Sequence, residues 1–90
     1  MYRIKKYSYE QAKKLGVDLW PSHTKGKKID VYKKGVKIAS IGDINYSDYP
    51  TYLETKGKQY ADERRKLYKL RHTERKKKGT AGYYADKILW

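Results

Sequence analysis

Apolar and polar residues alternate in two short runs in the middle of the chain, at residues 28–32 and 36–41. Both runs contain Ile and Val, and Lys34-Gly35 lies between them. A period of two on both sides of a short turn that contains Gly is typical of a β-hairpin. An isolated hairpin is only marginally stable in water, so at least one helix is expected to cover its apolar face.

The position of the turn also predicts which residues of the hairpin face each other. With Lys34-Gly35 as the turn, Tyr32 is expected opposite Lys37, and Val31 opposite Ile38. One face of the hairpin is then expected to carry Ile29, Val31 and Ile38, and the other face Tyr32, Lys37 and Ile41.

A short helix is expected before the hairpin, at residues 8–15. Ser8 and Gln11 match the capping-box pattern at its start, and Gly16 supplies the left-handed residue that commonly ends a helix. After this helix, the chain is expected to enter the core through Val17, Leu19 and Trp20.

Two further helices are expected on either side of a long basic run. The first opens at residues 48–51, with Thr51 as the start of a second capping box, and ends at Gly57. The last begins at Thr80, and Trp90 is expected to dock on the core or on a partner because a free Trp exposes a large apolar surface. The apolar stripe of this last helix consists of Ala81, Tyr84, Ala85, Ile88 and Leu89.

Residues 60–78 form the longest helical pattern of the chain. Arg64, Arg71 and Arg75 project into the apolar side of this pattern. An arginine in such a position must lie along tyrosine rings, pair with a buried carboxylate, or reach an external anion. This conflict between pattern and residue type makes the segment the first place to look for function. Its apolar side is expected to carry Tyr60, Ala61, Leu67, Tyr68 and Leu70.

These elements together predict a single basic α+β domain over residues 1–90. A β-hairpin at about residues 28–41 is expected to pack against a short N-terminal helix and two or three C-terminal helices. Charged residues make up 37% of the chain, which could indicate disorder, but eleven Tyr and two Trp favour a small core rich in aromatic residues.

Positive charge is concentrated in one quarter of the chain. The formal net charge is +13, and residues 56–78 hold eleven Lys and Arg against three acidic residues, a net +8. Such clustering is the electrostatic footprint of nucleic-acid binding, although cations also form ordinary solvated surfaces. The candidate phosphate-binding residues are Arg64, Arg65, Lys69, Arg71, Arg75, Lys76, Lys77 and Lys78, with Lys33 and Lys34 at the hairpin tip.

Several of these cations have simpler explanations. Lysines at 76–78 are favoured by the dipole of a helix that ends there, and lysines at a hairpin tip protect an exposed sheet edge from aggregation. The basic segment at residues 22–28 is expected to be a solvated connector, with contact to a phosphate backbone as the alternative.

The chemistry of enzymes is not indicated. The chain has no Cys, and His23 and His72 stand outside any metal-binding or catalytic spacing. Neither a nucleophile elbow nor a P-loop occurs. We therefore expect no catalytic residue, no metal and no cofactor. The chain also has no apolar run of about 20 residues and no signal-peptide pattern, so neither a membrane span nor secretion is expected.

Backbone contacts to duplex DNA, indifferent to sequence, are the favoured mode of binding because Asn and Gln are scarce. Stacking of tyrosines on single-stranded bases is the alternative. With no Phe in the chain, a place in the core is favoured for Tyr46, Tyr49, Tyr52, Tyr60, Tyr68, Tyr83 and Tyr84.

Several stretches resemble a group of short basic proteins of uncharacterised function encoded by large double-stranded DNA viruses. They are YEQAKKLGV (9–17), IASIG (38–42) with the Tyr-Pro turn that follows, YADERRKLY (60–68) and YYADKILW (83–90). The family supplies no catalytic residues. The resemblance implies a viral protein in the virion or inside the host cell, in cytoplasm or nucleus. In the virion, such a protein would face a densely packed genome or a capsid shell. The charge of residues 56–78 favours nucleic-acid binding, and the alternative is a minor capsid protein whose cations meet acidic shell proteins.

Overall fold

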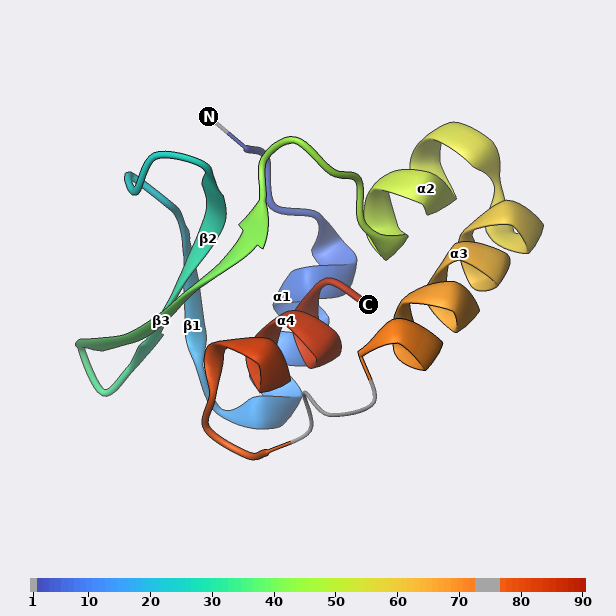
Figure 1. Cartoon of the computed structure of the whole chain (residues 1–90). Helices are drawn as coiled ribbons and strands as arrows, with labels where there is room; N and C mark the ends of the chain where they lie inside the picture. The colour runs from blue at the N-terminus through green and yellow to red at the C-terminus, as the bar shows by residue number, and fades with distance from the viewer. Residues whose placement is uncertain (1, 73–76) are drawn as a thin grey trace.

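Three antiparallel strands form a sheet in the order β1-β2-β3, and the helices lie on one side of it (Figure 1). The computed structural model describes residues 2–72 and 77–90. The elements are α1 (Lys6–Leu15), β1 (Asp18–Pro21), β2 (Lys27–Lys33), β3 (Val36–Asp43), α2 (Tyr49–Lys56), α3 (Lys58–Arg71) and α4 (Ala81–Ile88). The predicted α+β fold, with a hairpin between an N-terminal helix and C-terminal helices, is therefore confirmed.

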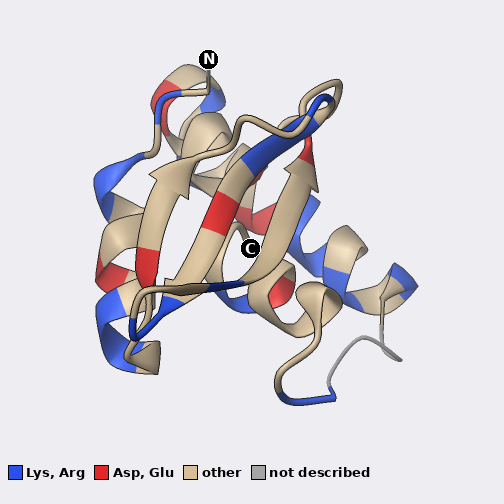
Figure 2. Ribbon diagram, turned by 90° about the vertical axis from the view of Figure 1, so that its left-hand side faces the viewer, with Lys and Arg blue, Asp and Glu red and all other residues tan. Residues whose placement is uncertain are grey.

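The core lies between the sheet and the two helices α1 and α4. Ile29 and Val31 of β2 and Ile88 of α4 are completely buried there. The opposite face of the sheet is not covered by a helix, as Figure 2 shows. Such a two-layer arrangement explains why the apolar residues of the strands alternate with polar ones.

The hairpin turn forms where the sequence predicts it. Lys34 and Gly35 both have positive φ angles, 51° and 79°, which is the backbone of the tight turns that match the twist of a hairpin. Tyr32 pairs with Lys37, as predicted. The next pair is Val31 with Ala39 rather than with Ile38, because a β-bulge interrupts the ladder between Val31 and Tyr32.

This bulge makes the predicted faces of the hairpin wrong. An extra residue in one strand shifts every later side chain of that strand to the other face. Ile38 is therefore exposed, whereas Ile41 pairs with Ile29 and is buried with it in the core.

The segment around α1 differs from prediction in two ways. Ser8 is not a helix cap: α1 begins at Lys6, and the buried Ser8 hydroxyl donates a hydrogen bond to the carbonyl oxygen of Ile88 at 2.9 Å. Gly16 ends the helix as predicted, with φ 71°. The residues that follow form β1, an edge strand, and its Trp20 points to solvent with 63% of its surface exposed. Leu19 enters the core, but Trp20 does not.

The long basic helix is shorter than predicted. Gly57, with φ 88°, separates α2 from α3 as expected, and α3 ends at Arg71. Lys77 and Lys78 are exposed and not helical, and residues 73–76 lie outside the described part of the chain. Of the five residues predicted on the apolar side of this helix, only two are buried. Ala61 and Tyr68 face the rest of the protein, whereas Tyr60, Leu67 and Leu70 are exposed.

Helices α2 and α3 pack on each other, and α3 contacts the last helix and the end of the chain through Tyr68 and Lys69. Trp90 docks as predicted: its ring stacks on Tyr68 with centroids 4.4 Å apart and an interplanar angle of 7°. Thr80 caps α4, as predicted, by accepting a hydrogen bond from the amide of Tyr83. Within the described residues, no helix has the length and apolar character that a membrane span requires.

Candidate functional site

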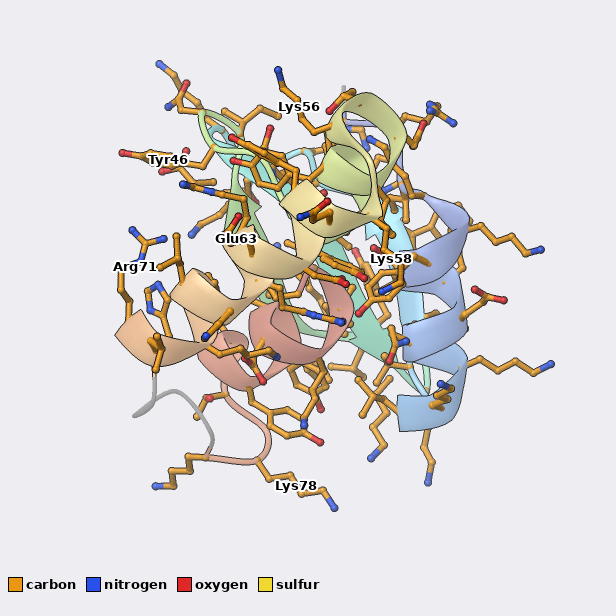
Figure 3. All side chains as sticks on the ribbon, turned by 90° about the vertical axis from the view of Figure 1, so that its right-hand side faces the viewer. Tyr46, Lys56, Lys58, Glu63, Arg71 and Lys78 are labelled. Atoms are coloured by element: carbon orange, nitrogen blue, oxygen red, sulfur yellow. The ribbon has the colours of Figure 1, made fainter. Side chains whose placement is uncertain are left out.

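A cleft of about 520 Å³ opens between α3 and the connection from β3 to α2, residues 44–48. One wall comes from α3, and the end of α4 with Trp90 closes the cleft at its base. In Figure 3, Tyr46 of the connection and Arg71 of α3 project from the same side of the molecule. The residues that line the cleft include Lys27, Lys28, Asp43, Tyr46, Asp48, Tyr52, Arg64, Tyr68, Arg71 and Trp90.

Arg64 and Arg71 bring positive charge to this cleft from the same side of α3, because seven residues make two turns of a helix. The Arg64 guanidinium carbon lies 5.8 Å from the centroid of the Tyr52 ring. Its Nε is buried and has no hydrogen-bond partner. Among the described residues, neither arginine forms an ion pair, so both guanidinium groups have donors to offer to an external acceptor.

The unsatisfied Nε of Arg64 is unusual for a native protein. A buried donor without an acceptor costs about 1–3 kcal/mol. Ring packing alone therefore explains the position of Arg64 only in part. An external anion that enters the cleft is the third of the explanations that the sequence pattern left open.

Acidic residues also line the cleft, but one of the two is neutralised within the protein. Lys28 Nζ lies 2.8 Å from Asp48 Oδ2 in a buried ion pair, and the Tyr2 hydroxyl donates to the same oxygen at 2.7 Å. Asp48 Oδ1 accepts from the Thr51 amide, so Asp48 caps α2, and the prediction that Thr51 is the cap is wrong.

The two hydrogen-bonding partners keep Asp48 ionised. Burial by itself raises the pKa of its carboxyl, but the hydrogen bond and positive charge of Lys28, with the Tyr2 hydroxyl, outweigh this and hold the pKa below its usual range. Burial and the adjacent Asp48 carboxylate together raise the pKa of Tyr2, so its hydroxyl stays protonated and donates.

The described lining therefore carries a net positive charge. Four cationic side chains, Lys27, Lys28, Arg64 and Arg71, face two carboxylates, Asp43 and Asp48. Since Lys28 and Asp48 cancel, the remaining charge of +2 comes from Lys27 and the two arginines against Asp43. A net charge of this sign favours anions over cations in the cleft.

Aromatic rings make up much of the remaining wall. Tyr68 and Trp90 form the stacked pair at the base, and Tyr52 lies against Trp90 with ring centroids 6.3 Å apart. Tyr46 is 72% exposed at the cleft, so the prediction that it belongs to the core is wrong. Its place in a polar connection, beyond the last strand of the sheet, accounts for this exposure.

Two of the predicted phosphate-binding residues of α3 are engaged within the protein. Lys69 Nζ lies 2.8 Å from the Asp86 carboxylate and 3.1 Å from its carbonyl oxygen. The Arg65 guanidinium lies 4.0 Å from the Tyr49 ring centroid and 3.7 Å from Asp62. Both residues line a separate groove on the α1 side of α3, away from Arg64 and Arg71.

The remaining predicted cations are dispersed. Lys33 and Lys34 lie at the hairpin tip, on the opposite side of the molecule from α3 (Figure 1). Lys77 and Lys78 are exposed in the turn before α4, and Figure 3 shows Lys78 extending into solvent. Arg75 and Lys76 lie outside the described residues. The described members of the predicted set therefore do not form one continuous surface, but Arg64 and Arg71 share the cleft.

Sequence reasoning missed two residues of the cleft. Lys27 belongs to the basic segment 22–28, which was expected to be a solvated connector, and its charge was the available signal. Tyr46 was placed in the core, and the polar residues around it were the signal for exposure.

No protein-family model, no curated protein and no solved structure matches this chain. The resemblance to viral proteins therefore stays a prediction, and the site is interpreted from its geometry.

Proposed function

We propose that this protein binds nucleic acid through backbone phosphates, without strong sequence preference and without catalysis, and that the cleft of Arg64 and Arg71 is its anchoring site. The observation that carries this proposal is the pair of guanidinium groups that no described acid neutralises, one of which has a buried donor without an acceptor. Phosphate oxygens match the fork of donors on a guanidinium.

The charge of the whole chain supports the same proposal. A net charge of +13 on 90 residues attracts polyanions over long distances and speeds their encounter with the protein. The cleft lining contains neither Asn nor Gln, the residues that commonly read adenine edges. Contacts to phosphates position a protein on nucleic acid without reading its sequence.

A salt series tests this proposal with a labelled oligonucleotide and fluorescence anisotropy. Each phosphate contact contributes roughly −0.7 to −0.9 to the slope of log affinity against log salt. The double variant R64Q/R71Q is expected to lose affinity and to reduce the magnitude of the slope by about 1.4–1.8. The matched control K33Q/K34Q removes the same charge from the hairpin tip and is expected to change affinity far less.

Two results contradict the proposal. No binding at low salt excludes nucleic-acid binding altogether. Equal losses in the two double variants show that binding follows total charge and that the cleft is not the anchor.

A role as a minor capsid or virion structural protein is the second candidate, and two exposed side chains favour it. Leu67 and Leu70 lie exposed on α3 beside basic residues, where a protein partner could cover them. Trp90 is not available as an anchor because it packs on Tyr68. The uncharged variant L67S/L70S separates the two roles: it abolishes binding to acidic shell proteins if the second role holds, and leaves nucleic-acid affinity unchanged if the first does.

A further inference from the structure

We infer that the cleft receives one unpaired nucleotide, with its phosphate on Arg64 and Arg71 and its base against the aromatic wall, so that the protein prefers single strands to duplexes. This inference rests on the proposed function and names the form of nucleic acid that the same site takes. It departs from the expectation of duplex DNA that charge alone suggests.

The size and depth of the cleft support an occupant larger than a phosphate. A volume of about 520 Å³ falls in the range of small-molecule sites, about 300–1,000 Å³. Its lining runs from the 72% exposed Tyr46 to the partly buried Trp90 and to Leu89, which is only 1% exposed, so the cleft has an inner end. A phosphate on the outside of a duplex fills only the mouth of such a space.

The bases of a duplex do not reach this inner end. They are stacked inside the double helix, and extruding one costs a few kcal/mol. An unpaired base is free of this cost and can enter together with its own phosphate. The depth of the cleft therefore discriminates between the two forms of nucleic acid.

Tyr46 provides the second, independent observation. Its ring is 72% exposed, lies at the cleft, and has no ring contact with another aromatic residue of the described chain. Exposed aromatic rings next to basic residues are the usual stacking platforms of single-strand-binding proteins. A tyrosine that served only the core would be buried, as Tyr49 and Tyr68 are.

The two tryptophans of the chain allow a direct test. Trp90 lines the cleft, whereas Trp20 is exposed on β1 and lines a different depression, beside α1. In the variant W20F, the remaining tryptophan emission reports on Trp90, which lines the cleft and also borders the groove of Arg65 and Lys69. This variant is titrated with oligothymidylate, with a duplex of equal length and with heparin, while anisotropy reports total binding. Loss of the emission change when W20F is combined with R64Q/R71Q, but not with K33Q/K34Q, assigns the change to the cleft.

Oligothymidylate is expected to change the Trp90 emission, whereas duplex and heparin bind without this change. The variant Y46A is expected to weaken single-strand binding by about 5-fold or more and to leave duplex binding unchanged. Tyr9→Ala is the matched control, because Tyr9 is also exposed but lies on α1. Tyr46 is 72% exposed and is not among the described residues that pack on the core cluster, so its replacement is expected to leave the fold intact.

Three outcomes overturn the inference. Equal affinity for single strand and duplex, with no effect of Y46A, shows that the cleft takes phosphates only, and the proposed function stands without the inference. Binding of an acidic peptide with the same change in emission, but of no nucleic acid, assigns the cleft to carboxylates. If neither the single strand nor the duplex changes the anisotropy or the tryptophan emission, the proposed function is contradicted as well.

Discussion

Replacing Asp48 by Asn tests the electrostatic structure of the cleft wall. The Asp48 side chain is 1% exposed and that of Lys28 is 5% exposed, with 2.8 Å between carboxylate and ammonium. The amide of Asn keeps the size of the side chain and an oxygen that can accept from the Thr51 amide, so the cap of α2 is preserved. What disappears is the negative charge, and the Lys28 ammonium stays buried without a counter-ion.

The expected loss of stability is large for a domain of this size. Removing one partner of a buried ion pair costs about 3–5 kcal/mol. A domain of 90 residues has a free energy of unfolding of roughly 5–13 kcal/mol, from about 0.05–0.15 kcal/mol per residue. Asp48→Asn is therefore expected to remove about a quarter or more of the total. The double variant K28M/D48N is expected to recover most of the loss, since an apolar side chain replaces the unpaired ammonium.

Urea unfolding followed by far-ultraviolet circular dichroism measures these free energies at pH 7, and an acid series adds a second check. The folded-state pKa of Asp48 lies below its unfolded value of about 4. Its stabilisation is therefore fully present above pH 4 and is lost as the pH falls through the folded-state pKa. The wild type is expected to lose more stability between pH 5 and pH 2 than Asp48→Asn does. A cost below about 1 kcal/mol at pH 7 would refute this account of the pair.

Three further substitutions test contacts around the cleft and the core. Gly42→Ala places a Cβ 2.7 Å from Leu89 Cδ1 at a φ of +80°, and is expected to destabilise by more than about 1 kcal/mol; a melting temperature equal to that of the wild type contradicts this. Lys69→Gln leaves the buried Asp86 carboxylate without its ammonium, so unfolding in urea is expected to be easier by about 1–3 kcal/mol, while nucleic-acid affinity stays unchanged; a selective loss of affinity would return Lys69 to the binding surface. Ser8→Ala removes a buried hydrogen bond, and thermal unfolding should show a loss of about 1 kcal/mol, or roughly 4–8 °C; no shift shows that the bond contributes nothing net.

Local backbone chemistry is what the sequence predicts well in this protein. Lys34-Gly35 forms the hairpin turn, and Gly16 and Gly57 end helices, because each position needs a positive φ angle. Thr80 caps α4 through its own hydroxyl. Each of these features depends on a few neighbouring residues, which the sequence displays directly.

Features that depend on distant residues were mispredicted. Ser8 has the sequence context of a cap, but its hydroxyl bonds to Ile88 at the other end of the chain. The β-bulge that exposes Ile38 shifts the register of β3, and the alternation of residues does not reveal it. The uncovered face of the sheet likewise decides that Trp20 is exposed.

The candidate site shows the same division. Arg64 interrupts the apolar pattern of its own helix. Because this conflict lies within one helix, the sequence alone was enough to indicate Arg64 as a residue of the site. Lys27 and Tyr46 join Arg64 through the folding of separate elements, so spacing along the chain does not predict them. The charge pattern also predicted more site residues than the cleft contains. Lys69 forms an ion pair with Asp86, and Lys33 lies at the hairpin tip, on the opposite side of the molecule from α3.

The indole signals of the two tryptophans test the central claim most directly. In a ¹H–¹⁵N correlation spectrum of the wild-type protein, each tryptophan gives one indole N–H signal, and the two lie at separate places on the fold. Addition of a single-stranded oligonucleotide is expected to shift the signal of Trp90 and to leave that of Trp20 in place. Shifts of equal size at both, or at Trp20 alone, would contradict a binding site in the cleft of Arg64 and Arg71.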